Sequence, residues 1–327
     1  MSKRVRLIIL IVCIILFFSI MPYIIGYSLG YRIDFEQKKI VATGGIYLRV
    51  WPSPADVYID SRNTGRTSLM TNSAFVQDLL PKNHVVLVRK DGYFDYQKTL
   101  PVKEKEATKL EHILLIKTNI AFEKLSDLPA QTDKTQSPFT KAKQFTLKNN
   151  NLYDNASGKP VLLIKNVIAF DVYQNIIYWV GTDNLLYQSD FLGKEKTEIF
   201  ESFYDPVKSI RISPDGLKIL FSNDYEIMFA YLNAKESEKI FLNRFSEKIG
   251  DCLWLNSDYV IFTLAGKIKI SEIDNKNEIN MVELPDKATV NGETIDIKNP
   301  KIDFAQQDKK LYILTGDTVL VSEQLTQ

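Results

Sequence analysis

The sequence contains little cysteine and little histidine, with two of each in 327 residues. Cys13 lies in the N-terminal apolar run and Cys252 lies far downstream, so the region between them has no disulfide and its cores must be stable without one. Cys252 stands in an apolar, strand-like run, where we expect a buried inert thiol. His84 and His112 also lie in apolar runs, without Cys, Asp or Glu at metal-ligand spacing, and we expect neither to bind a metal.

Signatures of catalysis are absent as well. The sequence has no Gly-x-Ser-x-Gly elbow, no His-Glu-x-x-His helix and no phosphate-binding loop. Glu104 and Glu106 alternate with lysines, which is typical of a solvated loop, and residues 274–278 lack the spacing and the glycine of a calcium loop. We therefore expect no catalytic residue, no cofactor and no metal site.

A surplus of basic charge is also missing. Three of the 41 Lys and Arg residues precede the apolar run, leaving 38 against 40 Asp and Glu residues in the rest of the chain. Charges of both signs are mixed along that region, whereas a protein that binds a polyanion gathers basic residues on one face. The composition therefore argues against nucleic acid as a partner.

The N-terminus does contain one long apolar run, residues 7–27, preceded by Lys3, Arg4 and Arg6. At about 1.5 Å per residue it forms a helix of about 31 Å, close to the hydrocarbon thickness of a bilayer. Basic residues stay on the cytoplasmic side, so we expect residues 1–6 inside and residues 28–327 outside. A cleaved signal peptide is the alternative, but its apolar region is usually about 7–15 residues and a small-residue cleavage site follows it. We expect an uncleaved signal anchor.

After a juxtamembrane segment, residues 28–45, short β-rich runs separated by turn residues fill residues 46–116. Such runs predict a small antiparallel sheet or sandwich. The chain here resembles the PEGA domain, which is named for a Pro-Glu-Gly-Ala turn. The residues that carry the resemblance are Pro52, Ser53, Pro54, Ala55, Gly65, Thr67, Gly92 and Tyr93. Pro54 and Ser61 stand where the family usually has glycine. The resemblance implies a surface-exposed binding or spacer module.

A polar stretch without apolar periodicity, within residues 117–147, predicts a linker. Beyond it, in residues 148–327, apolar strand pairs recur about every 42 to 50 residues, and each pair is followed by a further strand. The predicted pairs are residues 168–180, 210–221, 252–262 and 302–314. A period near 40–45 with four strands per unit is typical of propeller blades.

The first two strands of one repeat are joined by a turn made of Ser213, Pro214, Asp215 and Gly216. Proline at the second position and glycine at the fourth suit a type I turn, and this turn resembles the blade turn of TolB-like and WD40-like propellers. The number of blades stays open. Strands near residues 152–164 complete the last blade and close the ring, or they belong to an open array or to a degenerate fifth blade; we favour closure.

Together these features predict a mainly all-β ectodomain behind one transmembrane helix, made of a PEGA-like module and β-propeller-like repeats. We expect a bacterial cell-envelope protein that binds the bilayer through residues 7–27 and recruits a protein or glycan partner. A hydrolase with its site in the propeller channel is the rival, and it would be favoured if three or more of four aspartates shared a pocket: Asp171, Asp215, Asp258 and Asp308. A spacer without any ligand is the third alternative.

Overall fold

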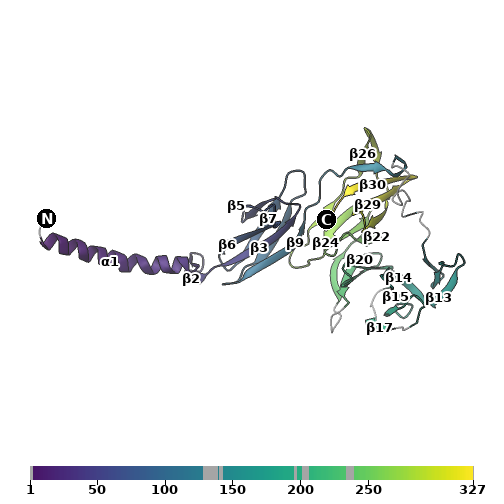
Figure 1. The fold of residues 1–327 in the computed structure, drawn as a ribbon, viewed down its shortest axis with the longest axis horizontal. Coiled ribbons are helices and arrows are strands. Elements are labelled where there is room, and N and C mark those ends of the chain that lie inside the picture. The colour runs from purple at the N-terminus through teal and green to yellow at the C-terminus, as the bar shows by residue number, and fades with distance from the viewer. Residues whose placement is uncertain are drawn as a thin grey trace. The chain divides into compact units, whose positions relative to one another are not determined.

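The structure is a computed structural model that describes residues 3–127, 139, 143–194, 197–200, 206–232 and 239–326. The chain divides into two compact units, Met1–Leu115 and Ile116–Gln327 (Figure 1). Part of the predicted linker, residues 128–138 and 140–142, lies outside the described residues.

The first unit begins with helix α1, Lys3–Ser28. Its side chains are exposed on all sides, and by length and composition it is able to cross a membrane. A signal sequence has the same properties. The juxtamembrane segment that follows forms a hairpin, β1 (Tyr31–Asp34) and β2 (Lys39–Ala42), which the sequence reasoning did not anticipate.

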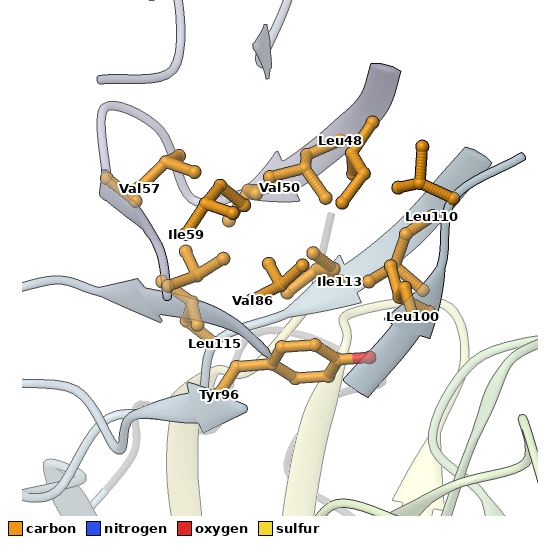
Figure 2. Close-up of a cluster of buried hydrophobic side chains, with 14 residues drawn as sticks. Leu48, Val50, Val57, Ile59, Val86, Tyr96, Leu100, Leu110, Ile113 and Leu115 are labelled. Atoms are coloured by element: carbon orange, nitrogen blue, oxygen red, sulfur yellow. The ribbon is translucent and has the colours of Figure 1, made fainter. Parts of the chain in front are cut away.

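Two sheets then form a module whose strands face each other across an apolar core (Figure 2). One sheet has the order β6-β3-β9 and the other the order β5-β4-β7-β8. The first comprises β3 (Gly44–Trp51), β6 (Ser73–Leu79) and β9 (Ala107–Leu114). The second comprises β4 (Asp56–Ile59), β5 (Arg62–Arg66), β7 (Asn83–Arg89) and β8 (Tyr96–Pro101). Alternate residues of the central strands point inward, as expected for a sheet with one buried face.

One pairing in this module is parallel, which differs from the antiparallel sheet that we predicted. β3 and β9 run in the same direction, with Gly45 opposite Ala107. The loop at residues 103–106 returns the chain to the start of β3, where the Gly45 amide donates to the Glu106 carbonyl at 3.0 Å. A Cβ on Gly44 would lie 2.2 Å from the Lys103 carbonyl oxygen, so this close approach requires glycine.

The second unit is built from successive antiparallel sheets. Four of them have four strands, in the orders β14-β15-β16-β17, β18-β19-β20-β21, β22-β23-β24-β25 and β28-β29-β30-β10. The bounds in the first two are β14 Val167–Tyr173, β15 Ile176–Gly181, β16 Leu186–Ser189, β17 Thr197–Phe200, β18 Ser209–Ile212, β19 Lys218–Ser222, β20 Glu226–Tyr231 and β21 Lys239–Arg244. Those in the other two are β22 Ile249–Trp254, β23 Tyr259–Leu264, β24 Lys267–Glu272, β25 Met281–Glu283, β28 Lys301–Ala305, β29 Lys310–Thr315, β30 Thr318–Gln324 and β10 Phe122–Lys124.

These sheets confirm the predicted repeat of strand pairs followed by further strands. The last interval is longer because a separate hairpin, β26 (Lys287–Val290) and β27 (Glu293–Asp296), lies between β25 and β28. A short 3₁₀ turn, η1 (Leu125–Asp127), follows β10.

The prediction for the N-terminal strands of this unit needs two corrections. The strands near residues 152–164 do not complete the last sheet, because they pair with each other as β11 (Phe145–Lys148), β12 (Asn151–Asp154) and β13 (Val161–Lys165). The strand that completes it is β10, which pairs with β30 and lies in the stretch predicted as linker. Its Phe122 is buried, and this apolar residue was the signal for a strand.

Hydrogen bonds from inner strands join neighbouring sheets of this unit. Oδ2 of Asp171 on β14 accepts from the Ile212 amide on β18 at 2.7 Å, and Oδ2 of Asp251 on β22 accepts from the Ile302 amide on β28 at 2.9 Å. Nε1 of Trp254 donates to the Arg211 carbonyl at 2.9 Å. Because unpaired groups buried there would destabilise the fold, these bonds fix how the sheets pack.

The turn between β18 and β19 also lies at a contact between neighbouring sheets. Gly216 has a φ of 72°, and a Cβ there would lie 2.6 Å from Cε1 of Tyr173 in the preceding sheet. The Tyr173 hydroxyl donates to the Pro214 carbonyl at 3.4 Å. Glycine is therefore needed at position 216 for both its backbone conformation and its packing.

We predict that Gly216→Ala lowers the free energy of unfolding of the second unit by about 2–3 kcal/mol, because both backbone strain and a clash result. Gly158→Ala is the matched control, since Gly158 has a φ of 78° and nothing within 4 Å of its Cβ position. It should lose only about 1 kcal/mol. Urea unfolding followed by ¹⁹F NMR of 5-fluorotryptophan reads this unit at Trp179 and Trp254. Equal losses in the two variants would contradict the packing role of Gly216.

Candidate functional site

The motif residues of the first module lie around one corner between β3 and β4. The Ala55 amide donates to Oγ1 of Thr67 at 2.9 Å, and the Thr67 amide donates to the Ala55 carbonyl at 2.9 Å. Nζ of Lys90 donates to the Pro54 carbonyl at 2.8 Å and lies 5.8 Å from the Tyr93 ring centroid. These contacts form a structural corner that comprises residues 52–55, Thr67 and Tyr93.

The two remaining motif residues are glycines with positive φ, one in a strand and one in a turn. Gly65 has a φ of 126° on β5, and Gly92 has a φ of 79° before Tyr93. The Ser53 hydroxyl bonds to the Asn72 side chain. Ser61, which stands where the family usually has glycine, itself adopts a φ of 67°. These residues shape the backbone of the module.

His84 of this module is buried and paired. Its Nδ1 lies 2.7 Å from Oδ2 of Asp60, and its Nε2 lies 2.8 Å from the Leu80 carbonyl oxygen. The Val85 amide donates to the other oxygen of Asp60 at 3.0 Å. Burial raises the pKa of Asp60, but the hydrogen bonds from His84 and Val85 outweigh this effect and hold that pKa below its ordinary value. The histidine thus fixes the β4–β5 turn to the start of β7.

The blade turn of the second unit is tightly bonded. The Gly216 amide donates to the Ser213 carbonyl at 2.8 Å, and Oγ of Ser213 accepts from the Lys218 amide at 2.9 Å. Nζ of the buried Lys218 lies 3.2 Å from Oδ2 of Asp215 and 3.9 Å from Oδ1 of Asp258. The turn therefore serves to position a lysine between two aspartates.

The four aspartates of the hydrolase alternative make separate contacts. Asp215 and Asp258 flank Lys218, whereas Asp171 bonds to the Ile212 amide. Burial raises the pKa of Asp171 in spite of the nearby Arg211. Asp308 accepts from the Tyr312 hydroxyl at 2.8 Å. Asp215 and Asp258 thus share one partner, whereas Asp171 and Asp308 are bonded to other groups.

The thiol of Cys252 is also unsuited to act as a nucleophile. Burial raises the pKa of the Cys252 thiol to about 12, so it stays protonated at neutral pH. Within the described ranges, no group of three or more His, Cys, Asp or Glu residues lies close enough to hold a metal ion.

A cleft of about 570 Å³ does open at one end of the β18–β21 sheet. Three backbone segments come together there because the strands are antiparallel: the residues before β18, the β19–β20 turn and the end of β21 (β20 is labelled in Figure 1). The cleft is lined by Pro206, Val207, Lys208, Asn223, Asp224, Tyr225, Glu226, Arg244 and Phe245.

Ion pairs hold the charged walls of this cleft in place. Asp224 lies 3.1 Å from Nζ of Lys208 and 3.2 Å from Nζ of Lys248, and the hydrogen bonds from these two lysines lower its pKa. Arg244 lies 2.5 Å from the buried Glu226. The positions of the charges are therefore set by the fold before any ligand arrives.

Between these charges the cleft presents an aromatic surface. Tyr225 is 43% exposed, and Phe245 lies beside it with its backbone amide donating to the Tyr225 carbonyl at 2.8 Å. An exposed ring next to fixed donors and acceptors suits a ligand with a flat apolar face and several polar groups, such as a sugar or a peptide. Sequence reasoning missed this site, although an aromatic residue inside the polar turn Asn223–Glu226 was a signal for it.

Comparison with known proteins gives a family match for part of the chain. The PEGA domain family matches residues 43–116, which include the corner and the His84 pair described above. No curated protein matches the sequence.

Solved structures give only distant similarities. A chain of the nidogen/laminin complex is 14% identical over 55% of this chain and 84% of its own length, with a TM-score of 0.33. The β-propeller domain of Cps50 (Swd1) from Myceliophteria thermophila is 11% identical over 50% of this chain and 55% of its own, with a TM-score of 0.36. The designed protein Ika8 is 14% identical over 75% and 69%, with a TM-score of 0.35. The blade assignment therefore rests on the strand pairing of this chain.

The Asp60–His84 pair predicts an acid-dependent stability. The pKa of Asp60 is lower in the folded module than in the unfolded chain, so the ionised carboxylate adds to the free energy of unfolding. This contribution is complete above the unfolded pKa of about 4 and is lost as the pH falls through the folded pKa. We expect Asp60→Asn to unfold at a lower urea concentration at pH 6 and to depend less on pH between about 5 and 3.

The ¹⁹F signal of Trp51 reports this module alone, because the other two tryptophans lie in the second unit. Asp91→Asn, at an exposed carboxylate of the same module, is the control and should resemble the parent chain. An unchanged acid profile in Asp60→Asn would rule out this role for the pair.

Proposed function

We propose that this chain is a membrane-anchored, extracytoplasmic binding or scaffold protein of the bacterial cell envelope. In this proposal α1 remains in the bilayer, the basic leader stays in the cytoplasm, and both β units lie outside. The support for anchoring is the length and apolar surface of α1 together with Lys3, Arg4 and Arg6 before it.

The observation that carries the binding role is the cleft lined by Tyr225 and Arg244. It combines an exposed ring, an arginine and ion-paired carboxylates, which are the groups that recognise an envelope glycan or a protein segment. We propose a non-catalytic role, since the candidate aspartates hold sheets and turns together. The PEGA match fits a binding or scaffold role in general.

Recruitment would follow from confinement. A chain that is tethered by one helix diffuses in the plane of the membrane, so any partner held at the cleft is concentrated at that surface. Affinity at the cleft itself need then be only modest.

For the anchor, we predict that alkaline carbonate leaves the full-length chain in the membrane pellet and that its N-terminal segment remains attached, as shown by intact mass. Protease added to spheroplasts should degrade residues 28–327. Reversing the charges of Lys3, Arg4 and Arg6 with glutamate should lower the fraction in this orientation, because retention of cations on the inside is lost. A mature chain that lacks α1 would mean that the helix is a cleaved signal.

For the cleft, we predict that Tyr225→Ala and Arg244→Ala each weaken binding of the full chain to purified envelope glycans or to a photo-crosslinked envelope protein by about tenfold or more. Tyr231→Ala is the matched control, because Tyr231 lies in the same sheet outside the cleft and is 46% exposed. Binding that survives both cleft substitutions would locate the site elsewhere. No binding above background in the parent chain would favour a spacer without a ligand.

A further inference from the structure

The hairpin β1–β2 presents an exposed apolar face directly after α1. We propose that this face inserts into the interfacial layer of the same bilayer that α1 crosses, so that the chain holds its membrane at two places. This inference rests on the proposed anchor and adds to it a second lipid-binding element, with phospholipid as the ligand.

The register of the hairpin separates its two faces. Ile33 lies opposite Ile40, and Tyr31 lies opposite Ala42, so these four side chains share one face, on which Ala42 is buried and the other three are exposed. Ile40 is 71% exposed and Phe35, in the turn, is 83% exposed. Ile33 and the preceding Leu29 are exposed as well. Exposed apolar side chains that are contiguous in this way mark an interaction surface.

The opposite face is tied to the module. Nη2 of Arg32 lies 3.0 Å from Oδ1 of Asp78 on β6, and Oε1 of Glu36 lies 3.3 Å from Nζ of Lys82 before β7. Asp34 is buried and accepts from the Glu36 and Gln37 amides at 2.9 and 3.1 Å. Because Arg32 and Glu36 make these contacts, the exposed Ile33–Ile40 pair is left facing away from them, while the ring centroid of Tyr31 at the other end of the same face lies 5.7 Å from Nζ of Lys105.

The hairpin is also fixed to the end of the helix. Nη1 of Arg32 donates to the Tyr27 carbonyl at 2.8 Å, and its guanidinium lies 3.5 Å from the centroid of the Tyr27 ring. The Thr43 amide and hydroxyl both donate to the Gly30 carbonyl at 2.8 Å. The apolar face therefore keeps a fixed position beside the last turn of α1.

That position is the lipid headgroup layer. Helix α1 has 26 residues, or about 39 Å at 1.5 Å per residue, which exceeds a hydrocarbon core of about 30 Å and brings Ser28 to the interface. Tyr23 and Tyr27 are exposed near this end, as is typical of interfacial aromatic residues. Lys38 in the hairpin turn is an exposed cation that suits lipid phosphates. In the proposed topology phospholipid surrounds this end of α1, which makes it the ligand within reach of the hairpin.

The test uses the full chain reconstituted in vesicles of phosphatidylethanolamine and phosphatidylglycerol, with single cysteines labelled by the environment-sensitive dye NBD. The probe site is Phe35→Cys in a Cys13→Ser, Cys252→Ala background. Met70→Cys in the same background is the matched aqueous control, because Met70 is 93% exposed near Ser73, which pairs with Arg49 toward the far end of β3. Native Cys13 in Cys252→Ala marks the membrane interior.

We expect the dye at position 35 to be quenched by nitroxide-labelled lipid and to be quenched severalfold less by iodide than the dye at position 70. A further chain carries the dye at Ile40→Cys together with Phe35→Asp. It should lose most of the lipid quenching seen with Ile40→Cys alone, because a charge in the turn opposes insertion. Hydrogen exchange of residues 43–116 verifies that each variant keeps its fold.

The outcomes separate the two proposals. Lipid quenching at Cys13 with water-like behaviour at position 35 would overturn the hairpin inference and leave the anchor intact. Water-like behaviour at both positions would overturn both. Equal lipid quenching at positions 35 and 70 would also refute the inference, because the whole module and not the hairpin would then contact lipid.

Discussion

Each sheet of the second unit depends on its neighbour to cover its inner strand. A four-stranded sheet has two faces and two edges, and alone it leaves both an apolar face and unpaired amides in water. Here the partly buried carboxylates of Asp171 and Asp251 accept the Ile212 and Ile302 amides of the next sheet. Such a bond to a charged acceptor is strong when buried, and its loss leaves a charge without compensation. The seams therefore specify the order of the sheets as well as stabilising them.

The same constraint explains why residues that look chemically active are engaged in structure. Asp171 has a raised pKa because it is buried, and Lys218 is buried between Asp215 and Asp258. Carboxylates with shifted pKa values are typical of active sites, but they also occur where two packed sheets need a hydrogen-bond acceptor away from water. At the open end of the β18–β21 sheet, by contrast, an exposed tyrosine and ion-paired cations line a cleft.

Sequence reasoning succeeded where a pattern depends on local periodicity. Residues close together in the sequence carry the signal for the long apolar run, for the strand pair around Ser213–Gly216 and for the turn at Gly92. It failed where pairing joins distant segments, namely β10 with β30 and β3 with β9 in parallel. It also missed the local hairpin β1–β2, whose strands have only four residues each. The cleft was missed for the same reason, because its lining comes from three separate stretches that only the sheet brings together.

The pairing of β10 with β30 has a consequence for biogenesis. The Ala121 amide donates at 3.0 Å to Oε1 of Glu323, a residue 202 positions further along the chain. During synthesis the early strand stays unpaired with β30 until all the intervening sheets have been made. Contacts of such long range make folding slow and leave intermediates open to aggregation. The last sheet is therefore completed only when β30 is available, and a chain that ended before β30 would leave β10 as an unpaired edge strand open to pairing with other chains.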